Sequence, residues 1–258
     1  MNAHVDQVAE PTGAARTSAL DRSVAMRLAG TEYDRFAAAL RPLSPAAWSQ
    51  PTVCPAWDVH AMACHVLGMA EMAASPIETV RQMRAAKRAG GLFIDALTGL
   101  QSRKHLHRTP QDLVDRLTAI GPKATRGRRR TPSLIRGRSM SDQPVDETGS
   151  QTEAWTLGYL LDVILTRDTW MHRSDIAVAT GQDMQLSAGH DGVLVADVAA
   201  EWATRHGQPC TLILTGPAGG SWVFGGGTER VELDAVGFCR IVSGRGDGIG
   251  LLSTRVPF

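Results

Sequence analysis

Apolar residues recur every three or four positions through the first part of the chain. From residue 20 to residue 43 this spacing predicts an amphipathic helix that ends before Ser44 and Pro45. The apolar positions of this segment are Leu20, Val24, Leu28, Tyr33, Phe36, Leu40 and Leu43. Because a helix with one apolar face must bury that face against another element, the pattern predicts a helix that packs against partners.

Further helices are predicted up to residue 120. One runs from about residue 59 to 74, with Asp58 as its N-cap after a turn that contains two prolines. Two more are predicted at 92–100 and 109–120, and Thr109 caps the second, with a proline at its first helical position. The pattern so far is that of a helical domain.

The next two segments differ sharply from each other. Residues 121–150 are rich in Gly, Pro and Arg, which predicts a long extended connection. Residues 152–180 carry apolar positions at helical spacing, which predicts one strong helix closed by Gly181. This helix completes the predicted bundle.

Beyond residue 185 the pattern changes to short strands between helices. A small α+β unit is predicted, because the segments alternate between helical spacing and short β-rich runs. Its expected elements are a helix at 193–206, strands at 211–215, 221–224 and 230–233, a helix opened by Asp234, and a last strand at 249–254.

These patterns predict three parts of the chain. Residues 1–17 are polar and without periodicity, which is typical of disorder. Residues 18–185 are predicted to form the helix bundle, and residues 186–258 the α+β domain. The fold class is therefore α+β overall, with a bundle of helices first.

Composition excludes several classes of protein. A formal net charge of +1 gives the whole chain no general attraction to nucleic acid or to a membrane surface. No apolar run approaches the roughly 20 residues of a membrane span, and the first residues lack the apolar core of a signal peptide, so we expect a cytoplasmic protein. Four cysteines without CxxC spacing indicate reduced thiols.

Common catalytic and nucleotide motifs are missing from the sequence. There is no GxSxG and no convincing Ser/His/Asp order. The glycines of GRGDGIG at 244–250 resemble a phosphate loop, but the chain ends at residue 258 and leaves no room for the helix that must follow. Neither a serine hydrolase nor a dinucleotide-binding domain is predicted.

Three residues have the spacing and chemistry of a metal site. Asp168 and His172 lie four positions apart, so on a helix both side chains project from one face. His65 lies on an otherwise apolar predicted helix, where an imidazole needs a partner. One carboxylate and two imidazoles suit zinc and its neighbours, and three protein ligands leave a position open for water or for a thiol. The same spacing is also compatible with a simple hydrogen-bonded Asp/His pair.

Three segments of the chain carry a resemblance to a known family. They are WSQPTVCPAWDVHAMACHVLG, RDTWMHRSDIAVATG and FCRIVSGRGDGIGLLSTRVPF. In order and content they resemble the mycothiol-dependent maleylpyruvate isomerase family, within the wider group of DinB-like metal-binding bundles. Two departures stand out: Ala56 replaces the usual glycine, and Asp168 replaces the usual glutamate, whose side chain is one methylene longer.

The resemblance implies both a fold and a chemistry. It implies an antiparallel four-helix bundle with a C-terminal domain similar to sterol-carrier folds, and a divalent metal, zinc by preference, held by His65, Asp168 and His172. It also implies mycothiol as cosubstrate, whose thiolate attacks a small electrophile. In an isomerase the adduct rotates and expels the thiol, whereas in a transferase the conjugate is released.

Several other residues are candidates for supporting roles. Asp175 lies three positions past His172 and is predicted to orient that ligand, or else to act only at the helix surface. Arg245 and Arg240 are predicted to bind a carboxylate of the substrate or thiol, with ordinary ion pairs as the alternative. Trp57 is predicted to form a wall of the cofactor pocket, or else to be core.

Other residues are expected to serve structure rather than chemistry. Cys54 and Cys64 are assigned to packing, and Arg173 to a salt bridge. The arginine cluster of the predicted 121–150 loop has two interpretations, a mobile solvated loop or a patch that contacts phosphate or a carboxylate-bearing thiol. Its members are Arg126, Arg128, Arg129, Arg130, Arg136 and Arg138.

The leading hypothesis is a metal-dependent, mycothiol-using S-transferase or isomerase. Its partners would be a low-molecular-weight thiol and a small electrophile, with no membrane and no nucleic acid. One alternative is a non-catalytic, DinB-like metal-binding protein with a stress-response or regulatory role. A second is a carrier of an apolar ligand, although a C-terminal domain of roughly 70 residues leaves little room for a pocket of several hundred Å³.

Overall fold

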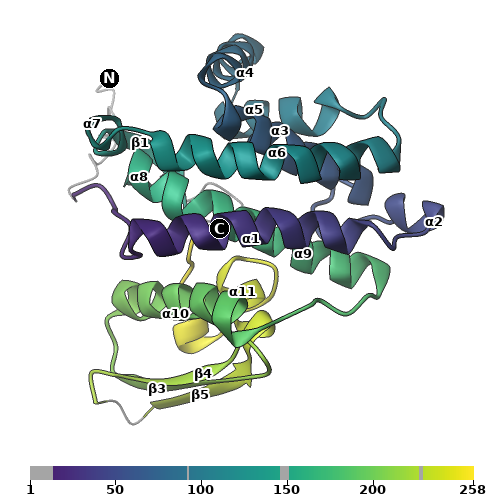
Figure 1. Ribbon diagram of the computed structural model, residues 1–258. Helices are drawn as coiled ribbons and strands as arrows, with labels where there is room; N and C mark the ends of the chain where they lie inside the picture. The colour runs from purple at the N-terminus through teal and green to yellow at the C-terminus, as the bar shows by residue number, and fades with distance from the viewer. Residues whose placement is uncertain (1–13, 92, 146–150, 227–228) are drawn as a thin grey trace, which may run out of the picture.

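The computed structural model describes residues 14–91, 93–145, 151–226 and 229–258. Within them a layer of long helices lies above a small domain of helices and strands (Figure 1). The predicted fold class, a helix bundle followed by a small α+β domain, is therefore confirmed. The predicted disorder of the N-terminus falls mostly on residues 1–13, which lie outside the described residues.

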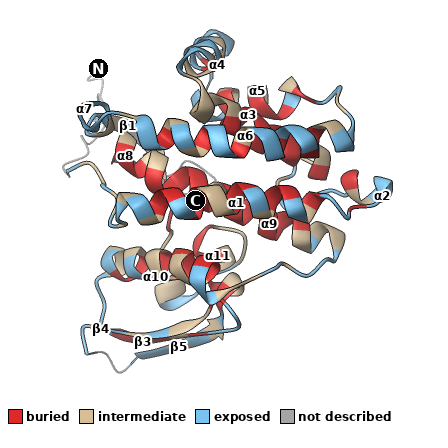
Figure 2. Cartoon of the chain, in the orientation of Figure 1, coloured by how far each residue is buried: buried red, intermediate tan, exposed pale blue. Residues whose placement is uncertain are grey.

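Four long helices form the bundle: α1 (Arg22–Leu40), α3 (Val59–Ala74), α6 (Pro110–Arg130) and α9 (Leu165–Thr180). Helix α1 packs against α6 and α9, and α3 packs against the same two helices from the other side. The helices α1 and α6 are antiparallel, because Arg22 bonds the Thr131 carbonyl at one end and Arg41 bonds Thr118 at the other. Figure 2 shows buried stretches along these helices, and apolar residues of α1, α3, α6 and α9 share one core cluster.

Shorter helices precede α6 in the described part of the chain. They are α2 (Pro45–Trp48), α4 (Pro76–Ala89) and α5 (Phe93–Lys104). Helix α5 packs against α3, and α4 packs mainly on α5, so α4 protrudes from the bundle (Figure 1). The sequence patterns left α4 unassigned and ended α5 early, because these helices bury few apolar residues.

Local capping signals located the helix ends correctly. The Asp58 carboxylate accepts a hydrogen bond of 2.8 Å from the Ala61 N–H at the start of α3. The Thr109 hydroxyl accepts one of 3.2 Å from Asp112, and Gly181 takes the left-handed conformation that ends α9, with φ 67°. The Asp58 and Thr109 side chains thus accept hydrogen bonds from N–H groups that the first turn of a helix leaves without a partner.

The predicted extended connection at 121–150 is wrong over its first part. Helix α6 continues through it to Arg130 and is followed by α7 (Ser133–Arg136) and strand β1 (Ser139–Pro144). Two glycines of α6 serve close packing between helices: a Cβ at Gly127 would lie 2.1 Å from the Ala73 carbonyl oxygen, and one at Gly121 would lie 2.9 Å from the Tyr33 Cβ. Tertiary contact therefore outweighs their low helix propensity.

This contact predicts that Gly127→Ala lowers the free energy of unfolding. The added methyl overlaps a backbone oxygen, so we expect a loss of about 1–3 kcal/mol, measured by urea denaturation. Gly137→Ala is the matched control, because its Cβ would find its nearest neighbour at 3.6 Å. Equal stability of the two variants would contradict the packing role of Gly127.

The helix predicted over 152–180 begins later than expected. Its first residues form strand β2 (Thr152–Thr156), which pairs antiparallel with β1. Arg16 extends this pairing, because its N–H donates to the Ala154 carbonyl at 2.8 Å. A short helix α8 (Leu157–Tyr159) and a π-helical turn η1 (Leu160–Ile164) then lead into α9. Threonine and tryptophan at 152–156 favour a strand, and pairing with β1 decides the outcome.

The C-terminal domain contains most of the predicted elements. They are η2 (Ala188–Gly192), α10 (Val193–His206), β3 (Cys210–Thr215), β4 (Gly220–Phe224), β5 (Glu229–Asp234), α11 (Ala235–Val242) and η3 (Gly250–Ser253). The strand order is β4-β3-β5, with β3 antiparallel to β4 and parallel to β5. The predicted last strand at 249–254 is wrong, because Gly250 adopts φ 61° and starts a 3-10 turn.

Helix α9 belongs to both halves of the molecule. Trp170 and Met171 lie in the same apolar cluster as α10, α11 and the sheet. Next to them Arg167, which is 1% exposed, forms ion pairs of 2.6 Å with Asp197 and 2.9 Å with Glu201 on α10. Helix α9 is therefore held directly against the C-terminal domain. None of the helices in the described part of the chain is both long and apolar enough to span a bilayer.

Candidate metal centre

Helices α3 and α9 bring His65, Asp168 and His172 together. The Nε2 atom of His65 lies 3.5 Å from Asp168 Oδ2, and the Nε2 atom of His172 lies 3.5 Å from Asp168 Oδ1. The side chains of His65 and His172 are 4% and 5% exposed, whereas that of Asp168 is 23% exposed. The group is thus buried in the bundle and reaches solvent on the side of Asp168.

The spacing of these atoms fits a metal ion. Two donors that each lie about 2.1 Å from a tetrahedral zinc ion are about 3.4 Å apart, close to the observed separations. One donor atom from each residue lies within 4.8 Å of the other two. The Asp168 Oδ2 atom is buried without a hydrogen bond, which leaves its lone pairs available to a cation. The residue types and their geometry therefore fit a divalent metal.

Without a metal the same residues form an ion pair. Burial raises the pKa of the Asp168 carboxyl, but the electrostatic attraction of His172 and of His65 outweighs burial and holds that pKa below its usual range. Burial lowers the pKa of His172, but Asp168 outweighs it and raises the pKa to about 9. A bound cation would take the place of this proton, because a histidine ligand must be deprotonated.

Trp57 covers the two histidines from the turn before α3. Its ring stacks on His65, with centroids 4.8 Å apart, and meets His172 edge-on at 5.7 Å. Trp57 therefore lies beside the candidate metal centre, and its role as a wall of a cofactor pocket stays a prediction. Cys54 lies in the same turn, and its sulfur lies within 4.8 Å of donor atoms of His172 and Asp175.

The proximity of Cys54 was missed by the sequence analysis, which assigned it to packing alone. The available signal was its place in the turn that also carries Trp57, directly before the helix of His65. The turn is held by Thr52, whose hydroxyl donates to the Trp57 carbonyl at 2.8 Å. Cys54 comes close to His172 and Asp175 because the tertiary fold places α9 against this turn.

Asp175 links α9 to the C-terminal domain. Its buried carboxylate accepts hydrogen bonds from His172 Nδ1 at 3.3 Å, from Arg240 Nη1 at 2.8 Å and from Arg245 Nε at 3.0 Å. The pKa of the Asp175 carboxyl is lowered overall. Burial alone would raise this pKa, but the hydrogen bond from His172 and the attraction of Arg245 outweigh burial. The two arginines predicted to bind a carboxylate therefore converge on a carboxylate of the protein itself.

A second cluster of possible donors is occupied by an arginine. Glu32, His190 and Asp191 offer atoms within 4.8 Å of one another. Arg173 lies among them, with Nε 2.7 Å from Glu32 and Nη2 2.7 Å from Asp191. A guanidinium already supplies the positive charge, so this cluster is an ion-pair network. The predicted salt bridge of Arg173 is confirmed.

The buried cysteines are poor nucleophiles. Burial raises the pKa of the Cys64 thiol to about 12, and it also raises the pKa of Cys239 well above its usual range. A thiol rather than a thiolate is present at neutral pH, so neither sulfur is activated for attack. This agrees with the packing role expected for Cys64.

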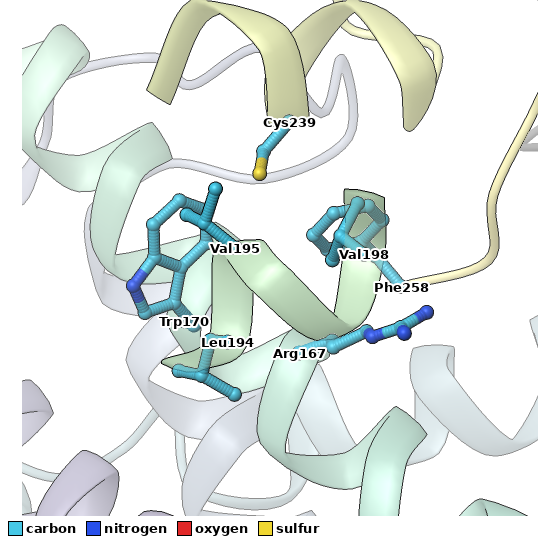
Figure 3. A pocket seen from close by; sticks show the side chains of 7 residues that line it. All are labelled: Arg167, Trp170, Leu194, Val195, Val198, Cys239 and Phe258. Atoms are coloured by element: carbon cyan, nitrogen blue, oxygen red, sulfur yellow. The ribbon is translucent and has the colours of Figure 1, made fainter. Parts of the chain in front are cut away.

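An apolar cavity between α9 and the C-terminal domain is small. The space in it that is open to a water-sized molecule is about 0 Å³, and its lining residues are Arg167, Trp170, Leu194, Val195, Val198, Cys239 and Phe258. Figure 3 shows the Cys239 side chain pointing from α11 toward α10 across this space. Ligand pockets usually measure about 300–1,000 Å³, so this cavity does not favour a carrier of a large apolar ligand.

Comparison with known proteins identifies similar domains and folds. A family model described as the mycothiol maleylpyruvate isomerase N-terminal domain matches residues 29–177. The crystal structure of the mycothiol-dependent maleylpyruvate isomerase is similar to this chain, with a TM-score of 0.53 and 18% identity over 88% of this chain and 90% of that chain. Its histidine-to-alanine mutant gives a TM-score of 0.52 and 16% identity over the same shares. No curated protein matches the sequence.

Proposed function

Since the chain belongs to the mycothiol maleylpyruvate isomerase family by its N-terminal domain, we propose that it is a metal-dependent enzyme that joins mycothiol to a small electrophile. The observation that carries this proposal is the convergence of His65, Asp168 and His172 at separations that suit one divalent ion. Zinc is the expected metal, because two imidazoles and one carboxylate are common zinc ligands. The product is either an isomer of the electrophile or its thiol conjugate.

The protein side chains would hold the metal in an open site. His65, Asp168 and His172 supply three ligands, which leaves at least one coordination position for the sulfur of a thiol. When bound, the metal supplies the positive charge that keeps this sulfur as a thiolate at neutral pH. Trp57 covers His65 and His172 and shields them from bulk water.

Asp175 supports this arrangement by fixing His172. It accepts the Nδ1 proton, which selects the tautomer whose Nε2 lone pair faces Asp168 and the proposed ion. Arg240 and Arg245 hold Asp175 in turn, and Arg240 does so through a single nitrogen, Nη1. We propose that the rest of the Arg240 guanidinium attracts a carboxylate of the thiol or of the electrophile.

Metal removal tests the proposed function. Zinc-loaded protein and protein stripped by a chelator should be titrated with mycothiol by calorimetry, with the metal content of each sample measured. We expect mycothiol to bind the zinc-loaded form and to bind the stripped form at least about 10-fold more weakly, because the thiolate loses its counter-charge. Zinc added back to the stripped form should restore binding.

Turnover separates the proposed enzyme from its main alternative. With maleylpyruvate and a panel of small electrophiles, an isomerase returns the thiol unchanged, whereas a transferase consumes one thiol for each product. Metal binding without any thiol-dependent turnover would favour a non-catalytic metal-binding or regulatory protein. Absence of metal from folded, zinc-reconstituted protein would overturn the proposed site itself.

A further inference from the structure

The arginine cluster predicted to lie in a loop divides into two groups in the structure. Arg126, Arg129, Arg130 and Arg138 are exposed, as the solvated interpretation expected. Arg128 on α6 is 1% exposed, and the side chain of Arg136 on α7 is 11% exposed. A buried guanidinium is costly unless its N–H groups are used, so these two inward arginines need a structural reason.

Both inward arginines bind the π-helical turn η1 that precedes α9. Arg128 donates from Nε to the Leu161 carbonyl at 2.6 Å and from Nη2 to the Thr166 hydroxyl at 2.6 Å. Arg136 donates to the carboxylate of Asp162 in the middle of the same turn. Arg128 thus bridges the turn, from a carbonyl within it to a side chain on the first turn of α9.

The turn η1 sets the directions in which the side chains of α9 point. A π-helical turn holds about one more residue than an α-helical turn, so the residues after it are rotated by about 100° from the directions they would have in an uninterrupted α-helix. Asp168 lies in the first turn of α9, two residues beyond Thr166, and His172 follows on the same face. The orientation of both candidate ligands therefore depends on the shape of η1.

We propose that Arg128, assisted by Arg136, is a positioning residue that stabilises η1 and thereby aims Asp168 at His65. This inference rests on the proposed metal site and deepens it. Arg128 touches none of the three candidate ligands; it acts through the Leu161 carbonyl and the Thr166 hydroxyl.

The test compares metal affinity and metal geometry in matched variants. Arg128→Gln removes the bridge, and Arg126→Gln is the control, an exposed arginine on the same helix. Zinc affinity is measured by competition with a chromophoric chelator, and site geometry by the d–d absorption of cobalt-substituted protein. We expect Arg128→Gln to weaken zinc binding about 10-fold or more and to change the cobalt spectrum, because supporting contacts of this kind usually have effects of about 10- to 100-fold.

A second variant keeps the inference testable if Arg128→Gln fails to fold. Thr166→Val keeps the shape of the side chain and deletes the hydroxyl that accepts from Arg128 Nη2. We expect the same change of the cobalt spectrum with a smaller loss of affinity. The inference alone is overturned if wild-type protein binds zinc and Thr166→Val, with any folded Arg128→Gln, binds it within twofold of the wild-type affinity. In that outcome the cobalt spectrum of the variants is also that of the wild type. Wild-type protein that binds neither ion would overturn the proposed function.

Discussion

Alanine in place of His65 or His172 is expected to lower zinc affinity at least about 100-fold. Zinc bound by protein ligands carries roughly 10–16 kcal/mol of apparent binding free energy, so one of three ligands accounts for about 3 kcal/mol or more. Both imidazoles face Asp168 at 3.5 Å, and neither has another histidine positioned to replace it among the described residues. Elemental analysis of purified protein and chelator competition measure the loss.

His107→Ala is the control for this experiment. His107 is an exposed histidine outside the proposed metal centre, so its loss should leave zinc content unchanged. The unfolding transition of each variant should be recorded on the same samples to show that the bundle is intact. Full zinc occupancy in a folded His65→Ala or His172→Ala variant would contradict the proposed ligand set.

Asp175→Asn is expected to weaken both the fold and the metal site. The change keeps the size of the side chain and removes the negative charge shared by His172, Arg240 and Arg245. Loss of one partner from a buried ion pair costs about 3–5 kcal/mol, and loss of a group that orients a ligand weakens metal affinity about 10- to 100-fold. Urea denaturation and zinc competition measure the two effects separately.

Asp183→Asn provides the matched comparison. Asp183 follows the end of α9 and is exposed, so its substitution should change the free energy of unfolding by less than about 0.5 kcal/mol. If Asp175→Asn reduces stability but leaves zinc affinity unchanged, Asp175 joins the two domains without orienting His172. If neither quantity changes, the link between the domain interface and the metal centre is refuted.

The helices of the bundle could be predicted where their signals were local. Asp58, Thr109 and Gly181 mark helix ends through hydrogen bonds or backbone angles within a few residues, and all three act as predicted. The spacing of Asp168 and His172 follows from helix geometry alone, which places positions four apart on one face. Local geometry of this kind needs no knowledge of the rest of the fold.

Glycine misled the sequence analysis in the region after residue 120. The Gly, Pro and Arg content of this segment indicates an extended connection, yet Gly121 and Gly127 let α6 approach Tyr33 on α1 and Ala73 on α3. Whether a glycine ends a helix or permits close packing depends on what lies opposite, which a single sequence does not reveal. For the same reason the sequence did not separate Arg128 from the exposed arginines of the cluster, because Arg128 is buried only when α6 continues through this segment.

The sequence by itself determined which residues could take part in a metal site and which helices carry them. The tertiary structure alone decided that α3 faces α9, that Trp57 stacks on His65, and that Asp175 is shared with Arg240 and Arg245. The physical reason is range: caps and helical spacing act over a few residues, whereas the ion pairs of Asp175 join it to residues 65 and 70 positions away.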